Sequence, residues 1–416
     1  MARHCCLSVA LPQPFRRPLC ATYHLTAPVN LHTALSFFLG SLLAGSSAAG
    51  QALPPPRIEW NPASLTLVQA GGNYARIVRL PGGGPLVCAF ELAGKVAVRR
   101  STDEGRTWTP PTTVAAWPLG SLSNPELLAL RNGTLLCFFN ERPRGGSSPA
   151  GQAAPRQPFA IALSRSADGG NTWSPVTVLY RAGTESGTGC WEPAAVELPN
   201  GVFTGEIQLF FANEQPYPKT AEQEISLLRS TDGGHTWSGA QAASFRAGSR
   251  DGMPVPVVLR DNAGVALAIE DNGLSGTFKP GIVFSDLATG WRGGPVRADS
   301  PRRWGALAVP LPPAVYAGAP YLRQMPGGET VLSFQQGDDP NNLRSARMAV
   351  SLGDRNARNF GVPSFPFPPT PGRGQLWNSL FVKDAQTITA VTSAFLNGQG
   401  GVWTMDGRVV PGSPTR

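Results

Sequence analysis

The chain has 416 residues, a formal net charge of +8 and only 15% charged residues. Gly (48) and Pro (41) together exceed a fifth of it, and this composition, poor in helix formers and rich in turn residues, favours many short β-strands. Hydrophobic residues make up 41% of the chain, enough for a large core, so disorder is not expected. The positive charges are scattered, with no basic run interleaved with aromatic residues, so nucleic-acid binding is not expected either.

The N-terminal region has the pattern of a leader. Residues 31–52 contain a short apolar stretch and then small residues, and three prolines follow. This order is typical of the hydrophobic and cleavage regions of a secretory signal, with cleavage between Ala49 and Ala52. The alternative is a membrane anchor, but the apolar core is shorter than the roughly 18 residues that a spanning helix needs. We therefore expect residues 1–52 to be a leader, residues 53–416 to be exported to the periplasm or the medium, and no membrane span to remain.

The cysteines do not suggest a disulfide framework or a metal site. Of the six, three precede the expected cleavage site, which leaves Cys88, Cys137 and Cys190. Cys88 and Cys137 lie in apolar runs, where a thiol behaves as a small hydrophobic group. An odd number without CxxC spacing argues against disulfides and against zinc, and we predict no metal and no other cofactor.

A hairpin-like unit recurs six times along the chain. In each copy an apolar or alternating run leads into a turn, mostly rich in Gly or Asn, and a second apolar run follows, which is a hairpin signal. The copies begin at Ala75, Pro125, Pro193, Pro254, Pro320 and Trp377.

In the first three units a third run ends at the motif Ser-x-Asp-x-Gly-x-Thr-Trp, over residues 101–108, 166–173 and 230–237. The motif recurs once per unit, whereas a chemical centre needs unlike residues, so we interpret it as a structural turn. The aspartate would accept backbone hydrogen bonds, the glycine would take a positive φ, and the tryptophan would pack between sheets. These structural pairs are Asp103 and Trp108, Asp168 and Trp173, and Asp232 and Trp237. A fourth strand follows each turn, so the sequence predicts an all-β fold, a six-bladed β-propeller with four-stranded blades, as a single domain over residues 53–416.

One mouth of the propeller axis collects polar and aromatic residues. There the innermost strands begin and the second strands end, and aromatic rings that stack on sugars would lie beside carboxylates that can cleave glycosidic bonds. We expect Glu192 and Glu270 to be catalytic. The expected substrate-binding residues are Arg76, Trp191, Arg250, Asp251, Tyr321, Trp377 and Asn378. A structural interpretation stays open for both glutamates: Glu192 could pair with a neighbouring arginine, and Glu91 occupies the same repeat position as Glu270 without an evident special role.

The turn motif resembles the Asp boxes (BNR repeats) of sialidases and related propeller glycosidases. Trp-Glu-Pro at 191–193, Leu-Pro-Asn-Gly at 198–201 and Gly-Met-Pro at 252–254 are similar to the exo-α-1,5-L-arabinanase family of six-bladed propellers. This resemblance implies a secreted glycoside hydrolase that acts on the ends of oligo- or polysaccharide chains, and we expect it to act as a monomer. The family's two glutamates would fall on Glu192 and Glu270. The resemblance also implies retention of configuration, with Glu192 as acid/base and Glu270 as nucleophile.

Two other functions stay open. An exo-α-sialidase (neuraminidase) would need three arginines that pair with a carboxylate, for which Arg76, Arg250 and Arg323 are the candidates. No tyrosine follows Tyr321, so the last blade cannot supply that family's tyrosine nucleophile. The third possibility, from a different class, is a carbohydrate-binding propeller without catalytic activity.

Overall fold

The hairpin-like runs of the sequence fold into six antiparallel sheets. The computed structural model describes residues 56–144, 156–185, 187–260, 263–339 and 342–410, all within the compact unit Ala52–Arg416. The expected leader and its cleavage site lie outside these residues. Within them, no helix is long and apolar enough to cross a membrane.

Each sheet is one blade, and the blades follow one another along the chain. Blade 1 contains β3 (Asn73–Arg79), β4 (Leu86–Leu92), β5 (Lys95–Ser101) and β6 (Thr112–Ala115). Blade 2 contains β7 (Gly120–Ala129), β8 (Leu135–Pro143), β9 (Ala160–Ser166) and β10 (Thr177–Arg181). Blade 3 contains β11 (Cys190–Glu197), β12 (Ile207–Asn213), β13 (Glu224–Ser230) and β14 (Gln241–Ser244). Blade 4 contains β15 (Asp251–Val258), β16 (Val265–Asp271), β17 (Lys279–Ser285) and β18 (Arg303–Gly305).

The last two blades depart from this simple order. Blade 5 has three strands, β19 (Tyr316–Gln324), β20 (Thr330–Gly337) and β21 (Arg347–Gly353), and its outer edge is continued only by a bridge between Val350 and Ser364. Blade 6 has β22 (Leu376–Val382), β23 (Thr387–Leu396) and β24 (Gln399–Val410), and its outer positions are filled by β1 (Arg57–Trp60) and β2 (Thr66–Ala70). The first strands of the described chain therefore close the ring against its last strand.

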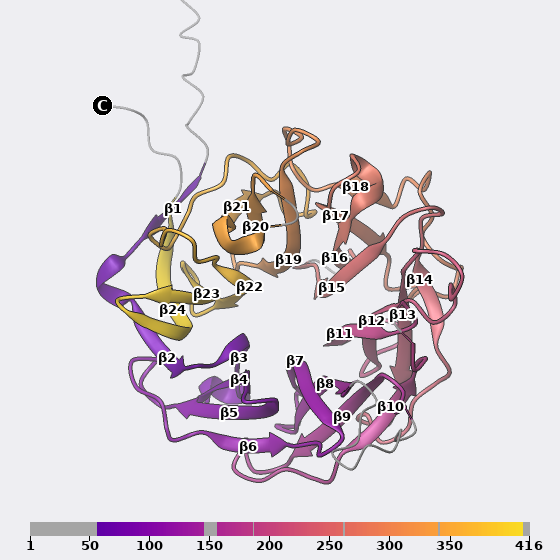
Figure 1. Ribbon diagram of the computed structural model, residues 1–416, viewed down its shortest axis with the longest axis horizontal. Helices are drawn as coiled ribbons and strands as arrows, with labels where there is room; N and C mark the ends of the chain where they lie inside the picture. The colour runs from indigo at the N-terminus through magenta and orange to yellow at the C-terminus, as the bar shows by residue number, and fades with distance from the viewer. Residues whose placement is uncertain (1–55, 145–155, 186, 261–262, 340–341, 411–416) are drawn as a thin grey trace, which may run out of the picture. The chain divides into compact units, whose positions relative to one another are not determined.

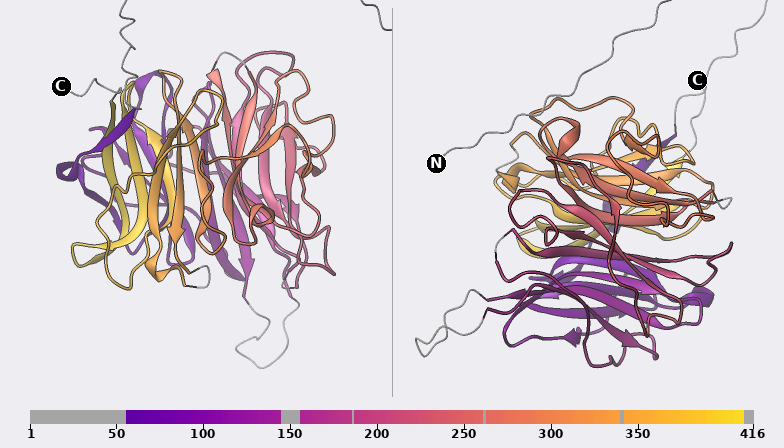
Figure 2. Two further views of the ribbon diagram at one scale, coloured as in Figure 1. Left: turned by 90° about the horizontal axis from the view of Figure 1, so that it is seen from above. Right: turned by 90° about the vertical axis from the view of Figure 1, so that its right-hand side faces the viewer.

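Figure 1 shows the six sheets around a common axis, with the innermost strands β3, β7, β11, β15, β19 and β22 nearest the centre. Seen from the side, the strands run between two faces of the propeller (Figure 2). We call the face on which the innermost strands begin the entry face. Because successive strands are antiparallel, the second strands end on the entry face, whereas the third strands end on the opposite face. The prediction of an all-β six-bladed propeller is confirmed, with a three-stranded fifth blade as its irregularity.

The three Ser-x-Asp-x-Gly-x-Thr-Trp motifs, which resemble Asp boxes, form nearly identical turns on the face opposite the entry face. In the first, Asp103 accepts hydrogen bonds from the Thr107 amide (2.9 Å) and the Thr107 hydroxyl (2.6 Å), and Gly105 has a φ of 82°. The hydrogen bonds from Thr107 lower the pKa of Asp103 to about 2. The tryptophans pack between blades: Trp237 of blade 3 meets Phe138 of blade 2 edge to face at 5.8 Å. The geometry is that of a turn that joins neighbouring blades.

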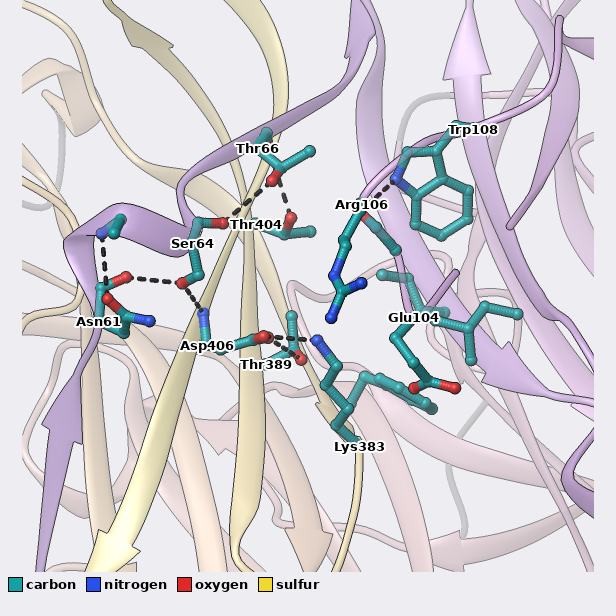
Figure 3. A pocket seen from close by; sticks show the side chains of 15 residues that line it. Asn61, Ser64, Thr66, Glu104, Arg106, Trp108, Lys383, Thr389, Thr404 and Asp406 are labelled. Carbon is teal, nitrogen blue, oxygen red and sulfur yellow. Dashed lines mark hydrogen bonds and ion pairs between the residues drawn. The ribbon is translucent and has the colours of Figure 1, made fainter. Parts of the chain in front are cut away.

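The junction of blades 6 and 1 contains a pocket of about 490 Å³ (Figure 3). Its charged groups are largely paired: Asp406 accepts hydrogen bonds from Lys383 and Thr389, both at 2.6 Å. The amide of Asp406 in turn donates to Ser64 Oγ at 2.9 Å. Since these contacts tie β24 to the N-terminal strands, we interpret this pocket as part of the ring closure.

Candidate active site

A ring of six backbone bulges surrounds the axis at the entry face. Each innermost strand breaks its register at the same point, where one non-glycine residue has a φ between 47° and 55°. The six residues are Tyr74, Asn124, Glu192, Met253, Ala319 and Trp377. This conformation costs an L-residue about 1–2 kcal/mol, so the surroundings must stabilise it. Four of the six are followed by proline, which suits a bulge because it has no N–H to offer to the sheet.

The stabilising contacts come from the preceding blade. In five of the six bulges the backbone N–H donates to a side chain at the end of that blade's second strand. The donor and acceptor pairs are Tyr74 to Ser393, Asn124 to Glu91, Glu192 to Asn140, Ala319 to Glu270, and Trp377 to Gln335. The sixth differs: the Met253 amide hydrogen-bonds to the carboxylate of Glu192, a residue of the ring itself. The regular pattern is therefore broken between blades 3 and 4, at Glu192.

Glu192 is half-buried at the start of β11, near two arginines and a backbone amide that favour its charged form and near Glu214, which opposes it. Burial raises the pKa of Glu192, and the charge of Arg142, the Met253 amide and the charge of Arg250 all act to lower it. Its backbone N–H donates to Asn140 Oδ1 at 2.9 Å, which fixes the bulge from which the side chain projects. Burial outweighs the groups that lower the pKa of Glu192, so its net pKa is raised.

Glu270 lies at the end of β16. Its Oε2 accepts a hydrogen bond from the Ala319 amide at 2.8 Å. The backbone of two glycines also lies against the carboxyl group. If Gly252 had a Cβ atom, it would lie 2.8 Å from Oε1, and a Cβ atom at Gly318 would lie 2.6 Å from Oε2. Burial, and next the charge of Glu192, raise the pKa of Glu270 to about 8. Glu270 is therefore protonated at neutral pH. The two glycines show why small residues must stand here, since any side chain would collide with the carboxyl group.

Glu192 and Glu270 form a coupled pair on adjacent blades. Each lies close enough to Arg250 for that charge to lower its pKa, and the charge of Glu192 raises the pKa of Glu270. Two neighbouring carboxyl groups whose ionisations influence each other can divide the roles of acid and nucleophile or base. The raised pKa of Glu270 suits a general acid, whereas the family resemblance implied Glu192 as acid/base.

Some of the expected substrate-binding residues lie below the ring, inside the channel. Arg76 is 2% exposed and its Nε donates to Glu126 Oε2 at 3.0 Å. The Tyr321 hydroxyl, which is also buried, donates to Glu126 Oε1 at 3.1 Å, and Arg323 lies 3.8 Å from the same oxygen. The Arg76 guanidinium lies over the rings of Tyr74 (4.1 Å) and Tyr321 (4.7 Å). These residues form a polar cluster around Glu126, largely buried between the innermost strands.

Two further residues that were expected to bind substrate, Asp251 and Asn378, are buried and hydrogen-bonded. Asp251 has no exposed surface; Arg303 binds both of its carboxylate oxygens and Ser244 donates to one of them at 2.8 Å. Asn378 is 1% exposed and its Nδ2 donates to the Gln375 carbonyl at 3.3 Å. The burial of Asp251 and its ion pair with Arg303 favour a structural role over the expected binding role, and the burial of Asn378 argues the same way.

Three of the expected residues do lie at the mouth. Arg250 is partly exposed and forms an ion pair with Glu214 at 2.5 Å. Trp191 is half-buried, with the Phe159 ring at 4.9 Å and the Arg142 guanidinium at 5.1 Å from its ring. Trp377 lies against Tyr74 at 5.9 Å and joins the apolar cluster of ring residues Tyr74, Met253 and Ala319. The floor of the mouth is thus apolar and aromatic, with the carboxylates at one side.

Two residues of the mouth were missed in the sequence. Arg142 follows Asn140 by two positions on β8, so alternation places both side chains on the same side of the strand. This spacing could have predicted that Arg142 lies at the mouth. Tyr316, at the start of β19, lies near Glu270, whose charge adds to burial in raising the pKa of Tyr316. Among the described residues, no group of three or more His, Cys, Asp or Glu is placed to hold a metal ion.

The sialidase arrangement is not assembled by the candidate arginines. Arg76 and Arg323 both face Glu126 inside the channel, whereas Arg250 binds Glu214 at the mouth. They therefore do not converge on one position where a substrate carboxylate could bind.

No family model matches the chain, and no curated protein does. Among solved structures, a protein of unknown function from Dyadobacter fermentans superposes with a TM-score of 0.64 at 15% identity, over 86% of this chain and 100% of that one. The α-L-arabinanase of Penicillium chrysogenum, complexed with arabinobiose, gives 0.59 at 16% identity, over 86% and 98%. The NanB sialidase of Streptococcus pneumoniae gives 0.55 at 12% identity, over 82% and 69%. At these identities the likeness shows the fold: a sialidase-like propeller that resembles the arabinanases.

Proposed function

We propose that the protein is a glycoside hydrolase that cleaves sugars from the ends of glycan chains, most closely as an exo-arabinanase does. The observation that carries this proposal is the pair of half-buried carboxyl groups Glu192 and Glu270 at the same mouth, whose pKa values are both raised and of which the charge of Glu192 raises the pKa of Glu270. The likeness in fold to an arabinanase and a sialidase supports a carbohydrate substrate. Export, expected from residues 31–52, is part of the proposal because a hydrolase of polymeric glycans needs access to them.

The pair can cleave a glycosidic bond in two steps. Glu270 gives its proton to the leaving glycosidic oxygen while the Glu192 carboxylate attacks the anomeric carbon and forms a glycosyl-enzyme. Glu270, now ionised, removes a proton from water, which attacks the same carbon and releases Glu192. Arg142, Arg250 and the Met253 amide act through Glu192, since each of them lowers its pKa and so favours the carboxylate needed for attack.

Turnover of a panel of glycans tests the proposal. The panel contains linear arabino-oligosaccharides, sialyl-lactose and other plant and host glycans, with the products analysed. We expect a terminal sugar to be released from the arabino-oligosaccharides. Release of sialic acid would instead support the sialidase alternative, and no turnover of any glycan would support a binding propeller.

Substitutions of the two glutamates test their roles. Glu192→Gln and Glu270→Gln should fold and each lose most of kcat, by about 10²–10⁴-fold. Glu91→Gln is the matched control, because Glu91 accepts a bulge N–H in blade 1 just as Glu270 does in blade 4, and it should keep most activity. With an activated aryl glycoside, azide should rescue Glu270→Ala and give a glycosyl azide of retained configuration. Near-normal turnover of both Gln variants would refute the assignment.

A further inference from the structure

A groove of about 580 Å³ lies on the entry face between blades 1 and 2. It is lined by the turn between β4 and β5, by the segment that leads into β7 and by the end of β8. These are the ends of strands that also carry Glu91 and Asn140 to the ring, so the groove opens on the same face as Glu192 and Glu270.

The lining of the groove is positively charged and has no acidic residue. Its charged members are Lys95, Arg142 and Arg144. Lys95 and Arg144 are exposed, and within the described part of the chain neither side chain takes part in a hydrogen bond or an ion pair. The sequence 145–155, which follows Arg144, has no Asp or Glu that could neutralise them. Elsewhere the arginines of this face, such as Arg246 and Arg250, are paired with carboxylates.

Arg142 connects the groove with the glutamate pair. It lines the groove, donates to Asn124 Oδ1 of the bulge ring, and stands over the Trp191 ring next to Glu192. Its charge acts on Glu192 directly. A glycan chain with one sugar between the glutamates can therefore continue past Arg142 into the groove.

The groove also offers an aromatic wall. Trp117 lines it and packs on Gly120, where a Cβ would lie 2.6 Å from the indole ring. A half-buried, rigidly held tryptophan beside unpaired cations suits a ligand that has both a sugar face and negative charge.

We propose that this groove binds an anionic portion of the substrate, a sugar unit that carries a carboxylate or a sulfate, next to the sugar that is cleaved. The inference rests on the proposed function for the place of the glutamates, and it adds the chemical class of the neighbouring sugar. A neutral glycan would leave Lys95 and Arg144 without a counter-charge, whereas an anionic one would form charge-assisted hydrogen bonds with them.

Calorimetric binding to the full propeller domain tests the inference with four probes. Trigalacturonate carries carboxylates, and its methyl ester is the matched neutral compound. A sulfated disaccharide carries sulfate in place of carboxylate, and arabinotriose is a second neutral reference. The native protein should bind trigalacturonate or the sulfated disaccharide more tightly than the neutral probes, and which of the two it binds identifies the anion. Binding of neither anion, or equal binding of the methyl ester, would overturn the inference.

A matched pair of double variants locates the binding site. Lys95→Gln with Arg144→Gln should weaken binding of the preferred anion at least about tenfold at low salt, because two charge-assisted contacts are lost. Lys219→Gln with Arg260→Gln removes the same two charges from exposed positions outside the groove and should change the affinity less than about twofold. Equal losses in both double variants would overturn the inference. These experiments measure binding and not turnover, so they test the groove separately from the glutamates. Full activity of the Glu192 and Glu270 variants would refute the proposed hydrolase mechanism but not anion binding in the groove.

Discussion

The two glutamates of the proposed active site occupy different positions in the repeat. Glu270 has a counterpart in Glu91, and both accept the amide of the next bulge, but only Glu270 faces a second carboxylate and a backbone wall without side chains. Glu192 is the only acidic member of the bulge ring. In the proposed mechanism, burial and next the charge of Glu192 make an acid of a position that is structural in blade 1.

The pH profile of kcat/KM should be bell-shaped. Glu192 must be ionised, so activity should rise with pH through its raised pKa, and Glu270 must be protonated, so activity should fall above about pH 8. Arg142→Gln should move the acidic limb to higher pH, because the charge of Arg142 opposes the effect of burial on Glu192. An acidic limb that stays in place in this variant would show that Arg142 does not act on the nucleophile.

The protonation of Glu270 should also be visible in stability. Between its ordinary pKa of 4.5 and the raised value of about 8, the folded chain holds a proton that the unfolded chain lacks, so this group makes stability fall as pH rises. Glu270→Gln mimics the protonated form and should stabilise the fold at pH 8 by about 1–2 kcal/mol. At pH 4, where both states are protonated, the gain should vanish. Thermal unfolding at the two pH values measures this, and an equal effect at both would contradict the raised pKa.

At the scale of single elements, the Asp boxes hold neighbouring blades together rather than serve the mouth. Trp173 belongs to blade 2 and packs against the cluster formed with blade 1, on the face opposite the glutamates. Its ring is half-buried and its Nε1 has no hydrogen-bond partner among the described residues.

Trp173→Ala should therefore cost about 2–4 kcal/mol of unfolding free energy, somewhat below a fully buried tryptophan. The kcat per folded molecule should stay near that of the native protein. Denaturant unfolding combined with activity on the same samples measures both, and Trp173→Phe is the control that keeps an aromatic ring at the blade interface. A stable but inactive Trp173→Ala would assign the residue to function instead.

The innermost strands explain which part of the site the sequence could predict. Periodicity and turn residues located the hairpins, and Glu192 and Glu270 followed from their equivalent places in the repeat. The direction of neighbouring side chains did not follow, because each bulge leaves two residues unpaired and shifts the alternation after it. Counting along the strand placed Arg76 and Tyr321 at the mouth, whereas the structure buries them in the channel. The prolines after four of the bulge residues were the available signal for these shifts.

At the scale of the whole molecule, the propeller is held by contacts between the two ends of the chain. β1 pairs with β24 from Arg57 and Val410 to Trp60 and Gly407, and no local sequence pattern could predict a pairing across the whole domain. The Trp60 ring packs on Gly407, where a Cβ would lie 2.5 Å from it, and Trp60 Nε1 donates to Ser364 Oγ at 3.0 Å. One strand therefore ties blade 6 to the outer edge of blade 5.

Removal of β1 should weaken the closed ring without touching the glutamates. A chain that starts at Asn61 loses the buried Ile58 and the packed Trp60, and we expect a cost of about 3–6 kcal/mol at about 1.5–3 kcal/mol for each of the two side chains. A chain that starts at Leu53 keeps β1 and is the control, which should melt at the same temperature as the protein with its leader. Trp60→Ala gives a milder version if the shorter chain does not fold, and it should lower Tm in the same direction. Because Glu192 and Glu270 lie in blades 3 and 4, the kcat of the folded fraction should be unchanged. If the chain that starts at Asn61 has the same Tm as the control, β2 alone is sufficient to close the ring and the prediction is wrong.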